Sequence, residues 1–403
     1  AHSFPTRRSS DLTRLGGVLE NYERLAEVLA EVLDDVVADS PDTAELAFML
    51  GELYEGRLDK PDEARAAYQR VLAFSPDDEK AFSAVERMLL ATESWPDLLE
   101  LYRDAADAAL DMEQRKEFLY KIAAIQESAN DDLDAAIHAY RDALDIDDRD
   151  ERSIRELDRL FLQAERFDDL AMHLRSQADQ AVDVAERNEL RRRLAAVYEE
   201  HLDDIVSAVD VYEEALMEPG GDARSLAELE RLILNEEQRQ RIAEILEPIY
   251  RESDEWKKLI VILKTQVEAL DAPADKVARF SEIAELHEQR GHNYLLAFGS
   301  LAKAFDADPQ DREVLDGMVR LAESIENWED LTRAIEGALD EMFDMDLKLD
   351  ALHLLGATYD QRLDMPRKAI EAYKAVLEIN EADARALDAL ERSEEHTSEL
   401  QSL

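Results

Sequence analysis

Residues 50–76 read LGELYEGRLDKPDEARAAYQRVLAFSP, and this stretch decides the fold. Its second half carries Ala64, Tyr68 and Leu72 four residues apart, a spacing that places three side chains on one face of a helix. Closely related triplets surround four later anchor residues, which are Tyr140, Tyr212, Leu301 and Tyr373. Successive anchors are 72 positions apart, except that the interval from Tyr212 to Leu301 is longer. Self-similarity at a fixed period predicts a repeat array.

A small residue stands seventeen positions before each anchor, directly after an aliphatic one. These small residues are Gly51, Ala123, Ala195, Ala284 and Gly356. Small side chains let two helix backbones approach closely, so we expect Gly51 to face Ala64 and Tyr68 to fill the gap between neighbouring helix pairs. Because one helix pair cannot bury its apolar stripe alone, the pattern predicts pairs that stack on one another.

The long interval exceeds the regular one by 17 positions, about one helix and its turn. Each interval of about 72 residues is expected to hold two helix pairs, and we call it a double repeat. A second marker locates the excess. The residue 27 positions after the anchor is Trp95 in the first double repeat and Phe167 in the second. In the third it is Arg239, and the matching aromatic residue is displaced to Trp256. We therefore expect an extra helix near residues 239–255. The tryptophans stand at repeat positions, which favours packing inside the array over a partner site.

The first double repeat resembles the tetratricopeptide repeat. The signature positions of that family are occupied here by Leu50, Gly51, Tyr54, Ala64, Tyr68 and Pro76. The resemblance covers residues 13–391 and implies an all-α fold, a right-handed superhelical solenoid of helix pairs. Two departures are plain. The half-period is longer than the roughly 34 residues of the family, and the second pair of each double repeat replaces the family's small residue with Glu86, Asp158, Glu230 or Val319.

Both ends of the chain resemble translated sequencing-adapter DNA. The segments are HSFPTRRSSDL, residues 2–12, and RSEEHTSELQS, residues 392–402. We expect residues 1–12 and 392–403 to be non-native, as tags and fusion scars are. On this reading the natural segment is a fragment, and its cellular location stays unknown, with the cytoplasm as the default.

Composition excludes several classes of partner. The chain has 96 acidic and 47 basic residues, a formal net charge of −49 at pH 7. Nucleic-acid binding depends on Lys and Arg that neutralise phosphates, so nucleic acids and anionic membrane surfaces are disfavoured. The sequence contains no cysteine and no apolar run of the roughly 20 residues that span a bilayer. The surface charge favours a soluble, monomeric array.

No motif for catalysis, cofactor binding or metal binding stands out, so we expect no enzyme activity, no cofactor and no metal. His287 and His292 are five residues apart, whereas a metalloprotease helix needs two His four apart on one face; we expect both to be exposed polar residues. The acidic stretch Asp145–Glu151 lacks the Gly and the terminal Glu of a calcium loop. A solvated turn is its simpler interpretation.

If the family's inner-face positions carry over, one helix position presents an acidic ladder. Its members are Glu55, Glu127, Glu199, Glu288 and Asp360. A neighbouring position presents Phe48, Tyr120, Arg192, Ser281 and His353. Together these residues predict a groove for partner proteins through basic or amphipathic segments. The alternative is that the acids only follow a helix template with polar exposed positions.

The leading functional hypothesis is a protein-interaction scaffold that binds partner segments in this groove. A second hypothesis makes the array the docking or sensory arm of a larger enzyme, such as a kinase, whose catalytic domain lies outside this fragment. RNA binding by a related helical repeat is disfavoured by the charge.

Overall fold

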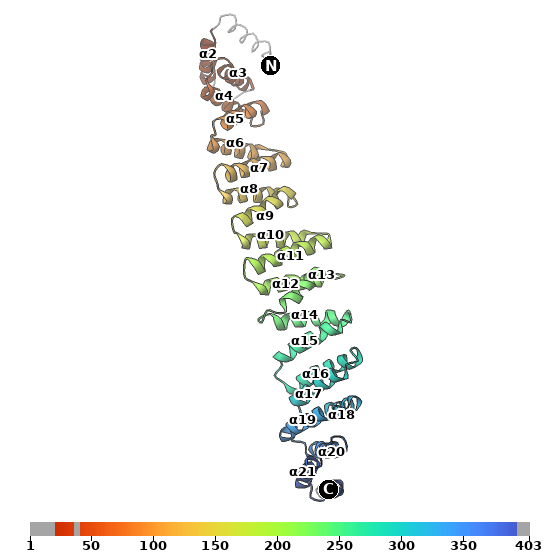
Figure 1. Cartoon of the computed structure of the whole chain (residues 1–403). Coiled ribbons are helices and arrows are strands. Elements are labelled where there is room, and N and C mark those ends of the chain that lie inside the picture. The colour runs from red at the N-terminus through yellow and green to blue at the C-terminus, as the bar shows by residue number, and fades with distance from the viewer. Residues whose placement is uncertain (1–20, 36–40, 393–403) are drawn as a thin grey trace. The chain divides into compact units, whose positions relative to one another are not determined.

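The computed structural model describes residues 21–35 and 41–392, and all regular structure within those ranges is helical. The expected non-native ends, residues 1–12 and 392–403, lie outside the described residues except for Arg392. The chain divides into two compact units, one of residues up to 182 with 200–202 and one of 183–199 with 203 onward. In each unit, consecutive helices pack side by side (Figure 1).

The first unit holds α2 to α10. Their bounds are Tyr22–Asp35, Pro41–Gly56, Pro61–Phe74, Glu79–Ala91, Trp95–Ala108, Met112–Ser128, Leu133–Ile146, Glu151–Gln163 and Phe167–Gln180. The second unit holds most of α11 and all of α12 to α21. Their bounds are Val184–Glu200, Ile205–Leu216, Ala223–Leu232, Arg239–Glu252, Trp256–Ala269, Pro273–Gln289, Tyr294–Ala307, Arg312–Ile325, Trp328–Ala338, Met345–Gln361 and Pro366–Ile379. A 3₁₀ turn, Leu339–Glu341, follows α19, and residues 384–392 are helical.

A capping aspartate recurs with the period of the anchors. Asp78 precedes α5, and its carboxylate accepts the backbone N–H groups of Lys80 and Ala81. Equivalent aspartates cap α9, α13 and α18 and precede the last helix, and these are Asp150, Asp222, Asp311 and Asp383. A carboxylate at this place satisfies N–H groups that have no partner inside the helix, so it marks where each of these helices begins.

A left-handed residue recurs in the turn inside the first helix pair of each double repeat. The five residues have φ between 48° and 53°, and they are Asp59, Asp131, Asp203, His292 and Asp364. Asp and His are among the side chains that adopt this conformation most readily. A left-handed residue therefore ends the turn at the same place in every double repeat.

The predicted anchors and their alanines form the core. The alanine four residues before each anchor has an exposed fraction of 0% in all five copies, which are Ala64, Ala136, Ala208, Ala297 and Ala369. The anchors are buried as well. The expected contact of Gly51 with Ala64 stays a prediction, and the ring of Tyr68 stands nearest to Gly51. A Cβ added at Gly51 would lie 2.6 Å from Tyr68 Cε1.

The acids that replace the family's small residue have a structural role in two double repeats. Glu86 accepts a hydrogen bond from the Tyr102 hydroxyl at 2.7 Å and pairs with Lys121 at 2.7 Å. Glu230 does the same with Tyr250 and Lys258, again at 2.7 Å each. A carboxylate held by a phenol and an ammonium joins three helices where a small residue would join two.

The range 239–255, where the sequence predicts an extra helix, holds α14. This helix packs against α15, and it gives the third double repeat five helices where the first, second and fourth have four. The displaced Trp256 begins α15. Its ring lies against the turn after α16, since a Cβ added at Gly291 would lie 3.2 Å from Trp256 Cη2. Trp328 is covered by the Arg362 guanidinium, 4.8 Å from a ring centroid. Both tryptophans therefore contact the next helix pair.

The buried alanine face allows a matched test within one helix. Ala64→Leu should overpack the α3–α4 contact and lower the free energy of local opening by about 1–3 kcal/mol. Ala66→Leu, on the exposed side of α4, should change it by less than about 0.5 kcal/mol. Hydrogen exchange of α3, α4 and α5 amides measures both. Equal protection in the two variants would contradict this packing.

Candidate protein-binding face

Four carboxylates of the predicted acidic ladder are paired inside the chain. Each lies on the first helix of a double repeat and meets an arginine from the next helix pair, at one constant spacing along the sequence. The pairs are Glu55–Arg87 at 2.5 Å, Glu127–Arg159 at 2.7 Å, Glu199–Arg231 at 2.6 Å and Glu288–Arg320 at 2.5 Å. Both Arg159 and Arg231 use their guanidinium to contact both oxygens of the partner carboxylate. The ladder is therefore also a set of contacts between neighbouring helix pairs.

Two of these contacts lower the pKa of the carboxylate that they involve. The Arg159 guanidinium holds the pKa of Glu127 below its usual range through hydrogen bonds, and Arg320 does the same for Glu288. Asp360 occupies the fifth ladder position, on α20. There, burial first and the Asp360 charge second raise the pKa of the Tyr373 phenol. A carboxylate that already interacts with an arginine offers less net charge to a partner.

The neighbouring strip of predicted residues packs on the anchor rings. The Phe48 ring lies 5.3 Å from that of Tyr68, Tyr120 lies 6.0 Å from Tyr140, and His353 lies 6.5 Å from Tyr373. Tyr120 and His353 are buried, whereas Phe48 and Arg192 are half-buried. In the first, second and fifth double repeats the strip residue is thus part of the packing inside its helix pair.

The polar members of the strip reach the capping aspartates. Arg192 Nη1 lies 2.6 Å from the Asp222 carboxylate, and His353 Nε2 lies 3.2 Å from that of Asp383. For Tyr120, burial first and then the hydrogen bond to the Asp150 carboxylate raise the pKa of the phenol to about 12. These partners were not predicted from the sequence. The signal was present, since an aspartate follows each strip residue at a constant spacing.

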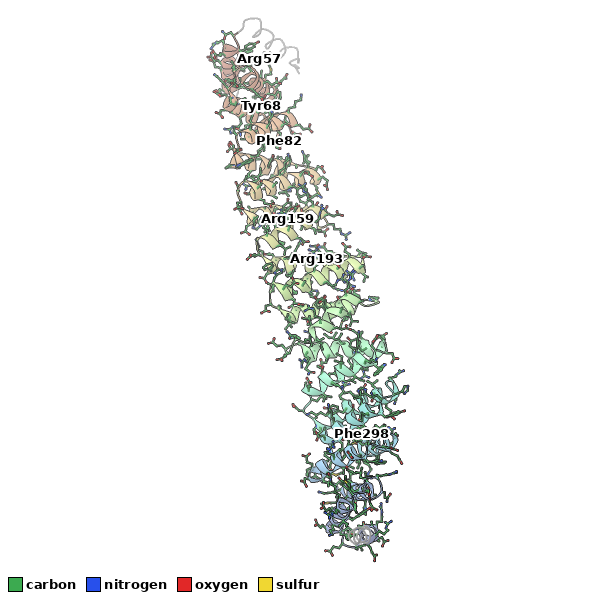
Figure 2. The ribbon with its side chains drawn as sticks, viewed as in Figure 1. Arg57, Tyr68, Phe82, Arg159, Arg193 and Phe298 are labelled. Atoms are coloured by element: carbon green, nitrogen blue, oxygen red, sulfur yellow. The ribbon has the colours of Figure 1, made fainter. Side chains whose placement is uncertain are left out.

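One open hollow is lined by residues of both the acidic ladder and the neighbouring strip. It lies between α3 and α5 and has a volume of about 850 Å³. Phe48, Glu55 and Tyr68 line it, and Tyr68 is labelled in Figure 2. The Tyr68 hydroxyl donates to Glu55 at 3.2 Å. The exposed side chains of Glu52 and Glu79 add negative charge to its lining, which also includes Lys80 and Arg87.

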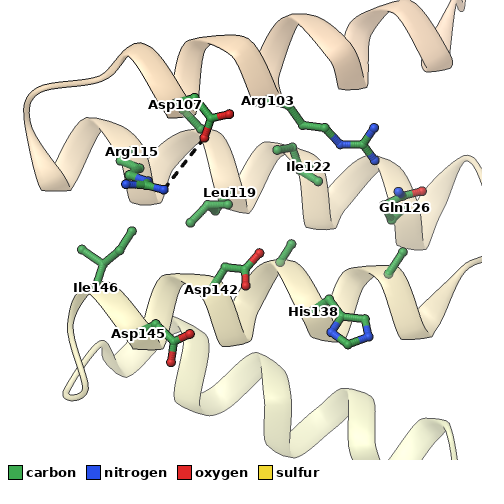
Figure 3. A pocket seen from close by; sticks show the side chains of 13 residues that line it. Arg103, Asp107, Arg115, Leu119, Ile122, Gln126, His138, Asp142, Asp145 and Ile146 are labelled. Carbon is green, nitrogen blue, oxygen red and sulfur yellow. Dashed lines mark ion pairs between the residues drawn. The ribbon is translucent and has the colours of Figure 1, made fainter.

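A second hollow has mixed charge and lies among α6, α7 and α8. Its volume is about 700 Å³. On one side the Arg115 guanidinium lies 3.9 Å from the Asp107 carboxylate, and a dashed line marks this ion pair in Figure 3. His138 and Asp142 project from α8 on the other side. Burial, and then the charge of Asp145, raises the pKa of Asp142. No predicted site residue lines this hollow.

The two stretches considered for metal binding are occupied by other contacts. The expectation that His287 is exposed is wrong, because it is buried on α16 and burial lowers its pKa, while His292 is the left-handed turn residue. In the acidic stretch, Asp147 and Asp150 hold the buried Lys116 ammonium at 3.0 and 3.4 Å. Across residues 21–35 and 41–392, no group of three or more His, Asp or Glu is placed to hold a metal ion.

Within the described part of the chain, no helix has both the length and the apolar content to cross a bilayer.

Comparison with known proteins identifies the repeat. Residues 45–78 and 349–383 each match a family model described as tetratricopeptide repeat. No curated protein is a significant match to the chain.

Solved structures with similar helical arrangements include Naa15/Naa10 bound to HypK-THB, at 15% identity and a TM-score of 0.32, where the match covers 98% of this chain and 62% of that one. The TPR domain of P58(IPK) matches at 15% identity and a TM-score of 0.22, over 98% of this chain and 99% of that one. The TPR2AB domain of yeast Sti1 in complex with pHSP90 matches at 13% identity and a TM-score of 0.25, over 63% and 98%. Identities this low say nothing of what the chain binds. The two matched segments hold the first helix pairs of two double repeats whose register runs through the array, and each of these two segments is therefore a tetratricopeptide repeat.

Proposed function

We propose that this protein holds partner polypeptides on the face formed by the first helices of its repeats, with the α3–α5 hollow as one point of contact. A protein-interaction scaffold is the general role of a tetratricopeptide array. The finer proposal concerns the partner, which would present Lys or Arg beside an apolar side chain. An extended or helical segment of this kind fits a groove with an aromatic floor and an acidic rim.

The α3–α5 hollow carries the proposal because it combines an aromatic surface with exposed carboxylates. Phe48 is half-buried, so one part of its ring packs on Tyr68 while another part faces the hollow. Glu52 is exposed one helical turn from Phe48 and is placed to meet a cation on the partner. The net charge of −49 would also attract a basic partner from a distance and speed its association.

The paired ladder carboxylates have a smaller part in this proposal than the sequence pattern suggests. Glu55 already accepts a hydrogen bond from Tyr68 and pairs with Arg87. A partner cation would have to compete with that arginine. The ladder residues therefore position the helices, and Glu52 with Phe48 provides the contact in the first double repeat.

Selection from a random peptide library tests the partner class. The peptides recovered on the chain should combine Lys or Arg with apolar residues, and their binding should weaken as salt rises because exposed charges are screened. Glu52→Lys should weaken the selected peptides about tenfold, since attraction becomes repulsion at one contact. Asp179→Lys, the same charge change on the exposed end of α10, is the control and should stay within about twofold.

Fluorescence anisotropy measures both affinities. Recovery of acidic peptides, or equal loss of affinity in the two variants, would contradict the proposed contact.

A second prediction separates structural carboxylates from binding carboxylates. Glu127→Gln should lower the free energy of unfolding by about 0.5–1 kcal/mol at pH 7 and low salt, because it removes the pairing with Arg159. The pKa of Glu127 is lowered in the folded state. The stabilisation is therefore full above the pKa of an unfolded Glu, and it is lost as pH falls through the lower folded value.

Urea denaturation at several pH values measures the difference between Glu127→Gln and the unaltered chain. The control is Glu100→Gln on the exposed side of α6, which should show no such difference. If Glu127→Gln left stability unchanged but weakened peptide binding, the ladder would be a binding surface and the structural assignment would be wrong.

A further inference from the structure

Three loops that lead from one double repeat into the next carry two apolar residues around an aspartate. The three motifs are Leu110–Asp111–Met112, Val182–Asp183–Val184 and Phe343–Asp344–Met345. Their spacing follows the anchor register. The first two motifs are one regular interval apart, and the last two are separated by one regular interval plus the long one. We name these segments the apolar loops.

The apolar side chains of these loops face solvent. The exposed fraction is 103% for Leu110, 67% for Met112, 81% for Phe343 and 57% for Met345. Val182 and Val184 are exposed as well. Single exposed apolar residues are ordinary on protein surfaces. The same two positions filled by apolar residues in three double repeats form a pattern that folding does not explain, since these side chains bury little.

Helix capping explains the aspartate in the second and third motifs. Asp344 accepts the backbone N–H groups of Asp346 and Leu347 at 2.9 and 3.1 Å and so caps α20. Asp183 accepts the N–H of Glu186 at 2.9 Å. In these two motifs the aspartate has a local partner and the two apolar residues have none of comparable extent, whereas the Asp111 side chain of the first motif makes no capping hydrogen bond.

The loop that carries Phe343 is held by three hydrogen bonds from one side chain. Gln310 Oε1 accepts the N–H groups of Phe343 and Asp344 at 3.0 Å each, and Gln310 Nε2 donates to the Glu341 carbonyl at 2.8 Å. An exposed ring on a backbone that is already ordered loses little conformational freedom when a partner covers it. This is the arrangement expected of a binding contact.

A hollow adjoins the first apolar loop. It has a volume of about 590 Å³ and is lined by Phe82, Phe118 and Leu110, with alanines at the end of α6. Phe82 is labelled in Figure 2. The charged residues of the lining are all acidic and comprise Asp77, Asp78, Glu79 and Asp111. An apolar hollow with an acidic rim and no basic lining residue complements an apolar side chain flanked by Lys or Arg.

We propose that the apolar loops at Leu110–Met112 and Phe343–Met345 are docking sites for amphipathic, Lys-rich or Arg-rich segments of a partner protein. These sites are separate from Phe48 and Glu52 of the α3–α5 hollow. The apolar side chains of the partner cover the exposed Leu, Phe and Met, and its cations meet the surrounding carboxylates. A second copy of this chain is a poor occupant, because two chains that each carry a net charge of −49 repel one another.

Methyl-labelled methionine provides a site-specific readout in the whole chain, which has nine methionines. The probe is a synthetic amphipathic helix of Leu and Lys, compared with a Leu–Glu and a Ser–Lys peptide of the same pattern. The Leu–Lys peptide should shift the methyl signals of Met112 and Met345. The methyl signals of Met172 and Met217 should stay unchanged, because these residues are 64% and 74% exposed but lie outside the apolar loops. The other two peptides should shift neither pair.

Substitution then tests the named side chains. Leu110→Ser should weaken binding at Met112, and Phe343→Ser at Met345, each about tenfold, because a large apolar contact is lost. The matched control is Leu234→Ser, at a side chain 78% exposed in another loop, which should have no effect. All three positions are exposed, so the thermal transition should not move. Glu52→Lys should leave these methyl shifts intact even if the α3–α5 hollow proves to bind nothing.

Several outcomes would overturn the proposal. Equal shifts of all four methionines would show non-specific adhesion, and equal binding of the Leu–Glu peptide would remove the role of charge. Unchanged affinity in Leu110→Ser and Phe343→Ser would exclude these contacts. Shifts caused by phosphatidylcholine vesicles but not by the peptide would assign the loops to a lipid surface. Shifts that vary with protein concentration alone would assign them to a second copy of the chain.

Discussion

The contact between an aromatic ring on one helix and a small residue on its partner determines where the rest of each repeat lies. At Gly51 and Gly356 the ring of Tyr68 or Tyr373 is so close that a Cβ would lie 2.6 or 2.5 Å from it. The spacing of the two helices is therefore set by one ring. The hydroxyl of the same Tyr68 donates a hydrogen bond to Glu55, one helical turn after the glycine. The packing contact therefore also orients a carboxylate of the acidic ladder. Ala123 and Ala195 take the glycine's place in two other double repeats and are fully buried there.

Charge is balanced locally along the first helices of the double repeats and remains in excess elsewhere. Arginines at one constant spacing after four ladder acids neutralise them, and Lys116 holds two loop aspartates. The chain still carries a net charge of −49. Exposed carboxylates beside aromatic or apolar surface are the combination that both proposed contacts share, and this is why each points to a basic, amphipathic partner.

The repeat and its core were predictable because packing restricts residue type most strongly at Ala64, Tyr68 and their copies, so the pattern survives in the sequence. The ion pairs were not predicted, although Arg87 and its copies recur at a constant distance from the ladder, because sequence alone does not show that residues at this spacing meet. The exposure expected for His287 was wrong, since its helical spacing to His292 carries no information about which side faces the core. The apolar loops were not predicted as binding sites, because the sequence alone does not show which apolar side chains remain exposed in the folded chain.

Ring-current shifts at the glycine Hα protons test the ring-on-glycine contact most directly. In a glycine-labelled sample, Gly51 and Gly356 should have Hα shifts displaced from those of Gly299 and Gly337, which have no neighbour within 4 Å of an added Cβ. Tyr68→Leu should abolish the displacement at Gly51 alone, and Tyr373→Leu at Gly356 alone. Shifts at Gly51 and Gly356 equal to those of the two reference glycines, or insensitive to these substitutions, would contradict the account.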